Sequence, residues 1–124
     1  MSATVAIIVV DLMFQSRIRA AAEALGFDAR IADSATAANI AIAAHPDLVV
    51  IDLHAPGIDA PSTIRFAKAE GANVLGFGRH TEPATLRSAR EAGADAVVAR
   101  SQLVDELPEL LRSLLPADDP PDSE

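Results

Sequence analysis

The stretch that decides the fold is residues 47–59, which read DLVVIDLHAPGID. Residues 48–51 (LVVI) form an apolar run rich in β-branched side chains, a pattern typical of a strand covered on both faces of a parallel sheet. Residues 5–10 (VAIIVV) form a second run of this kind. An acid directly follows each run, Asp11 the first and Asp52 the second. Because an acid that ends a buried strand is poorly solvated, these two carboxylates are candidates for pairing or for function.

Three shorter strands and five helical patterns complete the sequence. Residues 28–32 (DARIA) alternate in polarity, which predicts an edge strand, and residues 74–77 and 96–99 are short apolar strands. Helices are predicted between and after the strands, over residues 15–25, 34–44, 59–71, 81–92 and 103–114. In the last helix Pro108 is tolerated if Asp105 caps the helix start, because first-turn amides have no partner within a helix.

The strict alternation of strands and helices predicts an α/β fold, a flavodoxin-like (βα)5 doubly wound parallel sheet with strand order 2-1-3-4-5. In such a sheet the ligand crevice lies at the carboxyl ends of the first and third strands, so Asp11 and Asp52 are expected to converge there. The domain is expected to cover residues 1–116. Residues 117–124 (ADDPPDSE) are acidic and rich in proline, and this composition predicts a disordered tail.

The composition argues against several classes of function. The formal net charge of −8 and the scattered positions of the ten Lys and Arg residues oppose nucleic-acid binding, and four Phe without Tyr or Trp offer no base-stacking platform. No apolar run approaches the length that crosses a bilayer. There is no cysteine, so disulfides, thiolate catalysis and cysteine-ligated metals are excluded. The N-terminal sequence lacks the pattern of a secretion signal, and a cytoplasmic location is expected.

Residues 47–59 resemble the phosphoacceptor segment of response-regulator receiver domains. Residues 7–11 resemble the first strand of that family with its acid, and residues 92–95 (AGAD) resemble the turn before its last strand. The match in order and spacing covers nearly the whole predicted domain. The resemblance implies transfer of a phosphoryl group from a kinase phosphohistidine to an aspartate, assisted by a magnesium ion. Asp52 matches the acceptor, and Asp11 matches the first of the two acids that hold the metal.

Three positions of this pocket depart from the family pattern. Leu12 stands where the second acid belongs, Gly78 where a Ser or Thr hydroxyl is expected, and Arg100 in place of a lysine. The resemblance therefore implies a degenerate, pseudo-receiver pocket in which Asp11 and Asp52 form a weak candidate magnesium site, because magnesium needs only one or two protein carboxylates. Since a guanidinium is permanently charged, Arg100 either pairs with Asp11 or Asp52 as a built-in counter-ion or points to solvent.

Two further motifs have more than one interpretation. Leu12, Met13 and Phe14 are large apolar residues that follow a strand-end acid. They either form an apolar rim for a protein partner or, as we favour, fill the vacated metal site or pack under the first helix. Residues 52–57 (DLHAPG) fit the D-x-H-x-x-G string of corrinoid-binding domains, in which the histidine ligates cobalt. In those domains the motif follows the first strand, so His54 is interpreted here as an ordinary loop residue.

These observations lead to three hypotheses of function. The first is an atypical receiver domain in phosphorelay or two-component signal transduction that acts mainly by protein–protein contact, through the first helix or the last strand–helix pair, with a partner protein or with a second copy as a homodimer. The alternative is a genuine phosphoacceptor that a histidine kinase phosphorylates on Asp52. The distant alternative is a module that binds a small ligand, such as a corrinoid, at the strand ends. None of the three is an enzyme beyond self-phosphotransfer onto Asp52.

Overall fold

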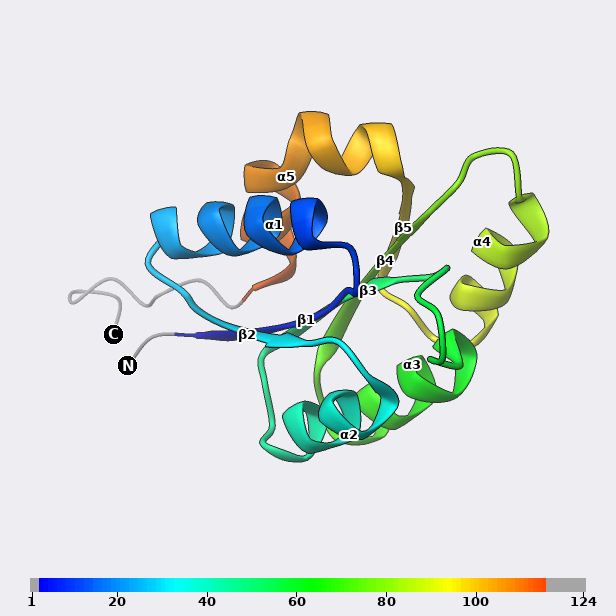
Figure 1. Ribbon diagram of the computed structural model, residues 1–124, viewed down its shortest axis with the longest axis horizontal. Helices are drawn as coiled ribbons and strands as arrows, with labels where there is room; N and C mark the ends of the chain where they lie inside the picture. Colours follow the sequence, from blue (N-terminus) through cyan, green and yellow to red (C-terminus); the bar gives the residue numbers. More distant parts are fainter. Residues whose placement is uncertain (1–2, 116–124) are drawn as a thin grey trace, which may run out of the picture.

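Five strands and five helices alternate along the chain in a computed structural model that describes residues 3–115. The elements are β1 (Thr4–Ile8), α1 (Leu12–Ala24), β2 (Asp28–Ala32), α2 (Ala35–Ala43), β3 (Leu48–Asp52), α3 (Ala60–Ala69), β4 (Asn73–Gly78), α4 (Pro83–Glu91), β5 (Ala96–Ala99) and α5 (Arg100–Leu114). The strands form one parallel sheet with the order β2-β1-β3-β4-β5, which confirms the predicted topology (Figure 1). The acidic tail expected over residues 117–124 lies outside the described residues.

Helices cover both faces of this sheet, α1 and α5 on one side and α2, α3 and α4 on the other (Figure 1). Alternate side chains of β3 point to the two sides. Leu48 and Val50 belong to the core beneath α1 and α5. Val49 and Ile51 belong to the core beneath α2, α3 and α4. All five residues of β3 are buried, and burial on both faces explains why its first four residues form a continuous apolar run. The fifth residue, Asp52, is an acid.

The start of α1 differs from its prediction. The helix begins at Leu12, three residues before the predicted start at Gln15, because the Asp11 side chain caps it. Oδ1 of Asp11 accepts a hydrogen bond of 3.0 Å from the backbone N–H of Phe14. The acid that follows β1 therefore has a local structural partner.

Asp105 does not cap the start of the last helix, which was the condition given for tolerance of Pro108. The helix α5 begins five residues earlier, at Arg100, and runs for 15 residues. It bends at Glu106, whose backbone is not helical (φ −120°, ψ 20°), and this break places Pro108 in the first turn of the second half, where a missing N–H costs little. In the part of the chain from residue 3 to residue 115, no helix is long and apolar enough to span a membrane.

Two acids at the amino ends of strands have structural partners. Oδ2 of Asp47 accepts a hydrogen bond of 2.8 Å from the backbone N–H of Thr4. Oδ2 of Asp95 accepts from the backbone N–H of Val74 and from Nζ of Lys68, each at 2.8 Å. These contacts join neighbouring strands at the amino edge of the sheet. Asp47 and Asp95 thus serve the structure of the sheet. The acids considered for function, Asp11 and Asp52, lie at the opposite, carboxyl edge.

Candidate functional site

The carboxylate of Asp52 ends β3 at the carboxyl edge of the sheet. Asp52 is 4% exposed, and both of its oxygens have partners. Oδ1 accepts a hydrogen bond of 2.9 Å from the backbone N–H of His54, and Oδ2 lies 3.5 Å from Nη2 of Arg100. A buried carboxylate needs such partners because its transfer out of water is costly. The central acid of the site is therefore held with its negative charge already balanced.

Arg100 is the first residue of α5, and its side chain covers this acid. The side chain is 34% exposed, and its guanidinium carbon lies 5.5 Å from the centroid of the Phe14 ring, in cation–π contact. The Phe14 ring packs in turn on the fully buried ring of Phe77, with 5.3 Å between the centroids. Of the orientations that the sequence left open for Arg100, the structure shows the one that pairs it with Asp52.

Asp11 lies at the same edge, since Ile8 of β1 is the register partner of Ile51 in β3. Its side chain is exposed and caps α1. Within residues 3–115, no hydrogen bond or ion pair joins Asp11 to Asp52 or to Arg100. The structure therefore brings Asp52 and Arg100 together and gives Asp11 a separate, helix-capping role.

The two carboxylates at this edge are both engaged by other partners. Magnesium is bound through one or two carboxylates and keeps several waters. Here Asp52 is already paired with Arg100, and Asp11 caps a helix. Leu12, at the position of the second acid, is 75% exposed and brings no oxygen. The described ranges contain no group of three His, Cys, Asp or Glu side chains that could hold a metal ion. The positive charge beside Asp52 is that of Arg100.

The three apolar residues at the start of α1 divide into two groups. Leu12 is 75% exposed and Met13 is 71% exposed, so the favoured expectation that they fill the metal site or pack under the first helix is wrong for both. Phe14 is half-buried and packs inside the site, as expected. A cavity of about 200 Å³ lies beside these residues and is lined by Met13, Phe14, Arg17 and Val104.

His54 is a site residue that the sequence pattern did not identify. Its side chain is 11% exposed, and its Nε2 accepts a hydrogen bond of 3.0 Å from the backbone N–H of Arg79. Its Nδ1 lies 3.7 Å from Oε2 of Glu82. The ring occupies space that Gly78 leaves open at the end of β4, because a Cβ at that position would lie 2.9 Å from Nε2. His54 lies in the turn after β3, as interpreted, but its ring is packed and hydrogen-bonded there.

Arg79 and Glu82 form the turn that follows β4. Nη1 of Arg79 donates a hydrogen bond of 3.0 Å to Oε2 of Glu82, and the Glu82 backbone N–H donates to the carbonyl of Arg79 at 3.1 Å. The side-chain hydrogen bond from Arg79 lowers the pKa of Glu82 below its usual value, against the opposing effect of desolvation. Glu82 is therefore a carboxylate at neutral pH, next to the ring of His54.

A cavity of about 400 Å³ opens beside the guanidinium that pairs with Asp52. It is lined by Arg79, His80, Thr81, Arg100 and Ser101, which come from the turn after β4 and the start of α5. The lining therefore includes two arginines and two hydroxyl residues, and of these Arg100 contacts the central acid.

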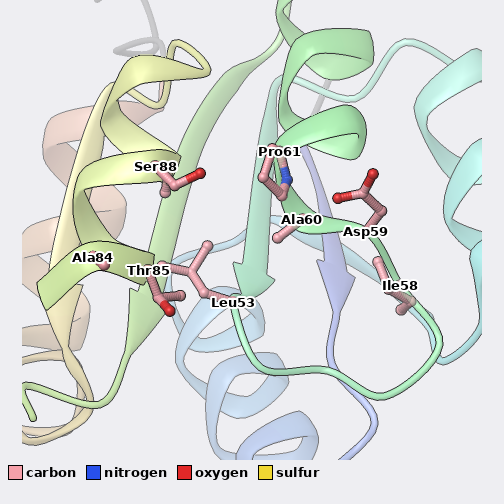
Figure 2. A pocket seen from close by; sticks show the side chains of 9 residues that line it. Leu53, Ile58, Asp59, Ala60, Pro61, Ala84, Thr85 and Ser88 are labelled. Atoms are coloured by element: carbon pink, nitrogen blue, oxygen red, sulfur yellow. The ribbon is translucent and has the colours of Figure 1, made fainter. Parts of the chain in front are cut away.

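A second cavity, also of about 400 Å³, lies between the starts of α3 and α4. Figure 2 shows Ala60 and Pro61 of α3 on one side, Ala84 and Thr85 of α4 on the other, and Leu53 between them. Its lining is largely apolar and does not include the central acid. This cavity is therefore separate from the strand-end site.

Comparisons with known proteins extend these findings. No protein-family model matches the sequence, and no curated protein matches it. Among solved structures, the chain is similar to NtrX from Brucella abortus, with a TM-score of 0.81 and 22% identity over 93% of this chain and 27% of that one. It is also similar to a response-regulator receiver domain from Bermanella marisrubri, with a TM-score of 0.81 and 21% identity over 92% of this chain and 98% of that one.

A response regulator from Thermotoga maritima gives a TM-score of 0.78 and 20% identity, with coverage of 92% of this chain and 98% of that one. The chain therefore has the fold of response-regulator receiver domains, and it spans about a quarter of the length of the NtrX chain. Within that fold, its central acid is balanced by an arginine and its fourth strand ends in a glycine.

Proposed function

We propose that this protein is an atypical receiver domain of two-component signalling that acts by contact with a protein partner and not by a phosphate switch. The observation that carries the proposal is the ion pair between Arg100 and Asp52, at 3.5 Å. It supplies from within the chain the charge balance that a receiver pocket otherwise obtains from a bound cation. Gly78 adds no hydroxyl to this edge. A domain with such a pocket presents one constant surface to its partner.

The chemistry of phosphoryl transfer explains why the ion pair matters. Transfer to a carboxylate brings anionic groups together, so it requires a cation between them and donors for the moving oxygens. In this pocket the guanidinium of Arg100 is engaged by Asp52 itself, and the other carboxylate oxygen accepts from the His54 backbone. An attack by Asp52 on a phosphorus atom would require it to give up these partners.

The start of α1 is the surface that we assign to the partner. Leu12 and Met13 lie next to each other in its first turn, and each exposes more than two thirds of its surface. Exposed apolar patches on protein surfaces often mark interaction sites. The cavity between Met13 and Val104 extends this surface, and Arg17 adds a positive charge to its rim. A matching partner would present apolar side chains with an acid at their border.

The alternative function, a genuine phosphoacceptor served by a histidine kinase, is favoured by one specific observation. Thr81 and Ser101 line the cavity beside Arg100. Their hydroxyls are the groups nearest in chemistry to the hydroxyl missing at Gly78. A movement of Arg100 away from Asp52 would free the acid of the ion pair that opposes its reaction.

Incubation with acetyl phosphate and magnesium, followed by intact mass measurement, distinguishes the two functions. We expect no added phosphoryl mass on the wild-type protein, because Asp52 is already paired with Arg100. A receiver domain that accepts phosphoryl groups, treated in parallel, is the positive control. An added mass that disappears in Asp52→Asn would establish the alternative and overturn the proposal.

Photo-crosslinking tests the partner surface. A crosslinking residue in place of Met13 should capture the partner in cells, whereas the same residue in place of Ile40 should not, although Ile40 is 67% exposed. Excess unlabelled wild-type chain should compete with the capture. The variant Leu12→Ser/Met13→Ser, also without the crosslinking residue, should not compete with the capture. Its free energy of unfolding should stay within about 0.5 kcal/mol of the wild type, because both side chains are exposed. Equal competition by both chains would exclude this surface.

A further inference from the structure

His54 and Gly78 fit each other across two neighbouring strands. Asp52, at the end of β3, is the register partner of Phe77 in β4, so the residues after each of them lie close together. A Cβ at Gly78 would lie 2.9 Å from Nε2 and 3.3 Å from Cδ2 of His54, and 3.2 Å from Cδ2 of Leu86. The φ angle of Gly78 is not in the left-handed region, so its backbone does not require glycine. The ring of His54 is the closest obstacle to a side chain at this position, followed by Leu86.

The same ring makes a directed contact with the turn after β4. Nε2 accepts the hydrogen bond from the Arg79 backbone N–H, so in the neutral ring the proton is on Nδ1. Nδ1 faces the carboxylate of Glu82 at 3.7 Å, and Glu82 is itself held by Arg79. The hydrogen bond to Nε2 and the carboxylate that faces Nδ1 therefore both favour the same orientation of the His54 ring.

His54 connects this turn to the central acid. Its backbone N–H donates to Asp52, and its side chain accepts from Arg79, 25 residues away along the chain. A single residue therefore joins the end of β3 to the segment between β4 and α4. The connection involves no ligand and no modified side chain.

We propose that His54 is a positioning residue that holds the segment between β4 and α4 against the end of β3, in the space that a hydroxyl side chain at Gly78 would occupy. The inference rests on the proposed function and deepens it, because it identifies what sets the position of this segment. In a pocket that works as a switch, a hydroxyl would move with the phosphoryl group. Here an imidazole ring keeps the segment in one place.

Hydrogen exchange of the Arg79 amide tests this role directly. In His54→Ala we expect its exchange to be about fivefold faster, the factor that corresponds to one hydrogen bond of typical net strength. His54→Gln offers a side-chain oxygen that can accept from the same N–H, and it should restore part of the protection. His80→Ala removes an exposed histidine of the same turn and should leave the Arg79 amide unchanged. Equal exchange in wild type and His54→Ala would overturn the inference.

A double-mutant cycle tests the fit between ring and glycine. Gly78→Ala should lower the urea midpoint of the wild-type chain, and by less in the His54→Ala background, because the atom closest to the new methyl group, Nε2 of His54, is then absent. An equal fall in both backgrounds would contradict the fit. If Gly78→Ala does not fold alone, recovery of folding in His54→Ala/Gly78→Ala supports the fit, and failure to recover contradicts it. Phosphorylation of the wild type on Asp52 would overturn the proposed function while leaving the exchange result to decide the role of His54.

Discussion

Replacement of Arg100 by methionine should lower the free energy of unfolding by about 2–3 kcal/mol at neutral pH. The variant leaves Asp52, which is 4% exposed, without its counter-charge. The expected loss is smaller than the roughly 3–5 kcal/mol typical of a fully buried pair, because Arg100 is 34% exposed and water can reach the space it leaves. Methionine keeps an apolar stem near Phe14, so the loss reports mainly on charge. Urea denaturation measures it.

The matched control removes both charges. In Asp52→Asn/Arg100→Met no charge lacks a partner, and the amide oxygen at position 52 can still accept from the His54 backbone. Most of the lost stability should therefore return. Arg100→Lys keeps the positive charge and should cost less than Arg100→Met. If Arg100→Met and the wild type unfold at the same urea concentration, Asp52 does not depend on Arg100, and the counter-ion role is wrong.

The sheet could be predicted because its signals are local. Residues 5–8 and 48–51 are apolar because β1, which ends at Ile8 and so before the predicted end at residue 10, and β3 are covered on both faces, and residues 28–32 alternate because β2 lies at an edge. The edge assignment and the right-handed crossovers then fix the order of the strands. Each of these steps depends on residue type and spacing alone.

The helix starts were predicted less well, because an apolar pattern becomes visible only at the first buried side chain. In α1 the first buried apolar side chain is that of Ile18, and the prediction placed the helix start three residues before it, at Gln15. The helix begins earlier because Asp11 caps it, and its first turn contains Leu12 and Met13. Both lie before the first buried residue and face away from the core, which is why an expectation based on residue type alone failed for them.

The site could be predicted only in part. The ion pair between Arg100 and Asp52 was one of three arrangements left open, and it could be foreseen because the predicted strand order brings both residues to the same edge of the sheet. The contact between His54 and Gly78 depends on the rotamer of a ring, which no spacing encodes. The available signal was the glycine at the end of β4, Gly78, together with a large side chain just beyond the end of β3, that of His54.

The loss of Arg100 should also make the pocket responsive to magnesium once a second acid is supplied. Leu12 is 75% exposed, so Leu12→Asp should change stability by less than about 0.5 kcal/mol. The first turn of α1 contains no acid, and a carboxylate there is favoured by the helix dipole. In Leu12→Asp/Arg100→Met, a carboxylate stands at the position that matches the second acid of the receiver pattern, and Asp52 has no guanidinium.

A cation that binds only the folded state stabilises it by mass action, by about 2.7 kcal/mol at a concentration 100 times its dissociation constant. Magnesium chloride at about 10 mM should therefore raise the urea midpoint of Leu12→Asp/Arg100→Met and recover much of the stability lost with Arg100. The wild type, whose Asp52 is paired, should not respond. Sodium chloride at equal ionic strength separates binding at the site from screening.

Leu12→Asp alone is the decisive comparison. It has the same acids as the double variant but keeps Arg100, and we expect little response to magnesium from it. A response as strong as that of the double variant would mean that magnesium displaces the guanidinium easily and that the natural pocket lacks only an acid. A response confined to the double variant would mean that Arg100 stands in the place of the metal, because the guanidinium that pairs with Asp52 is the one difference between the two proteins.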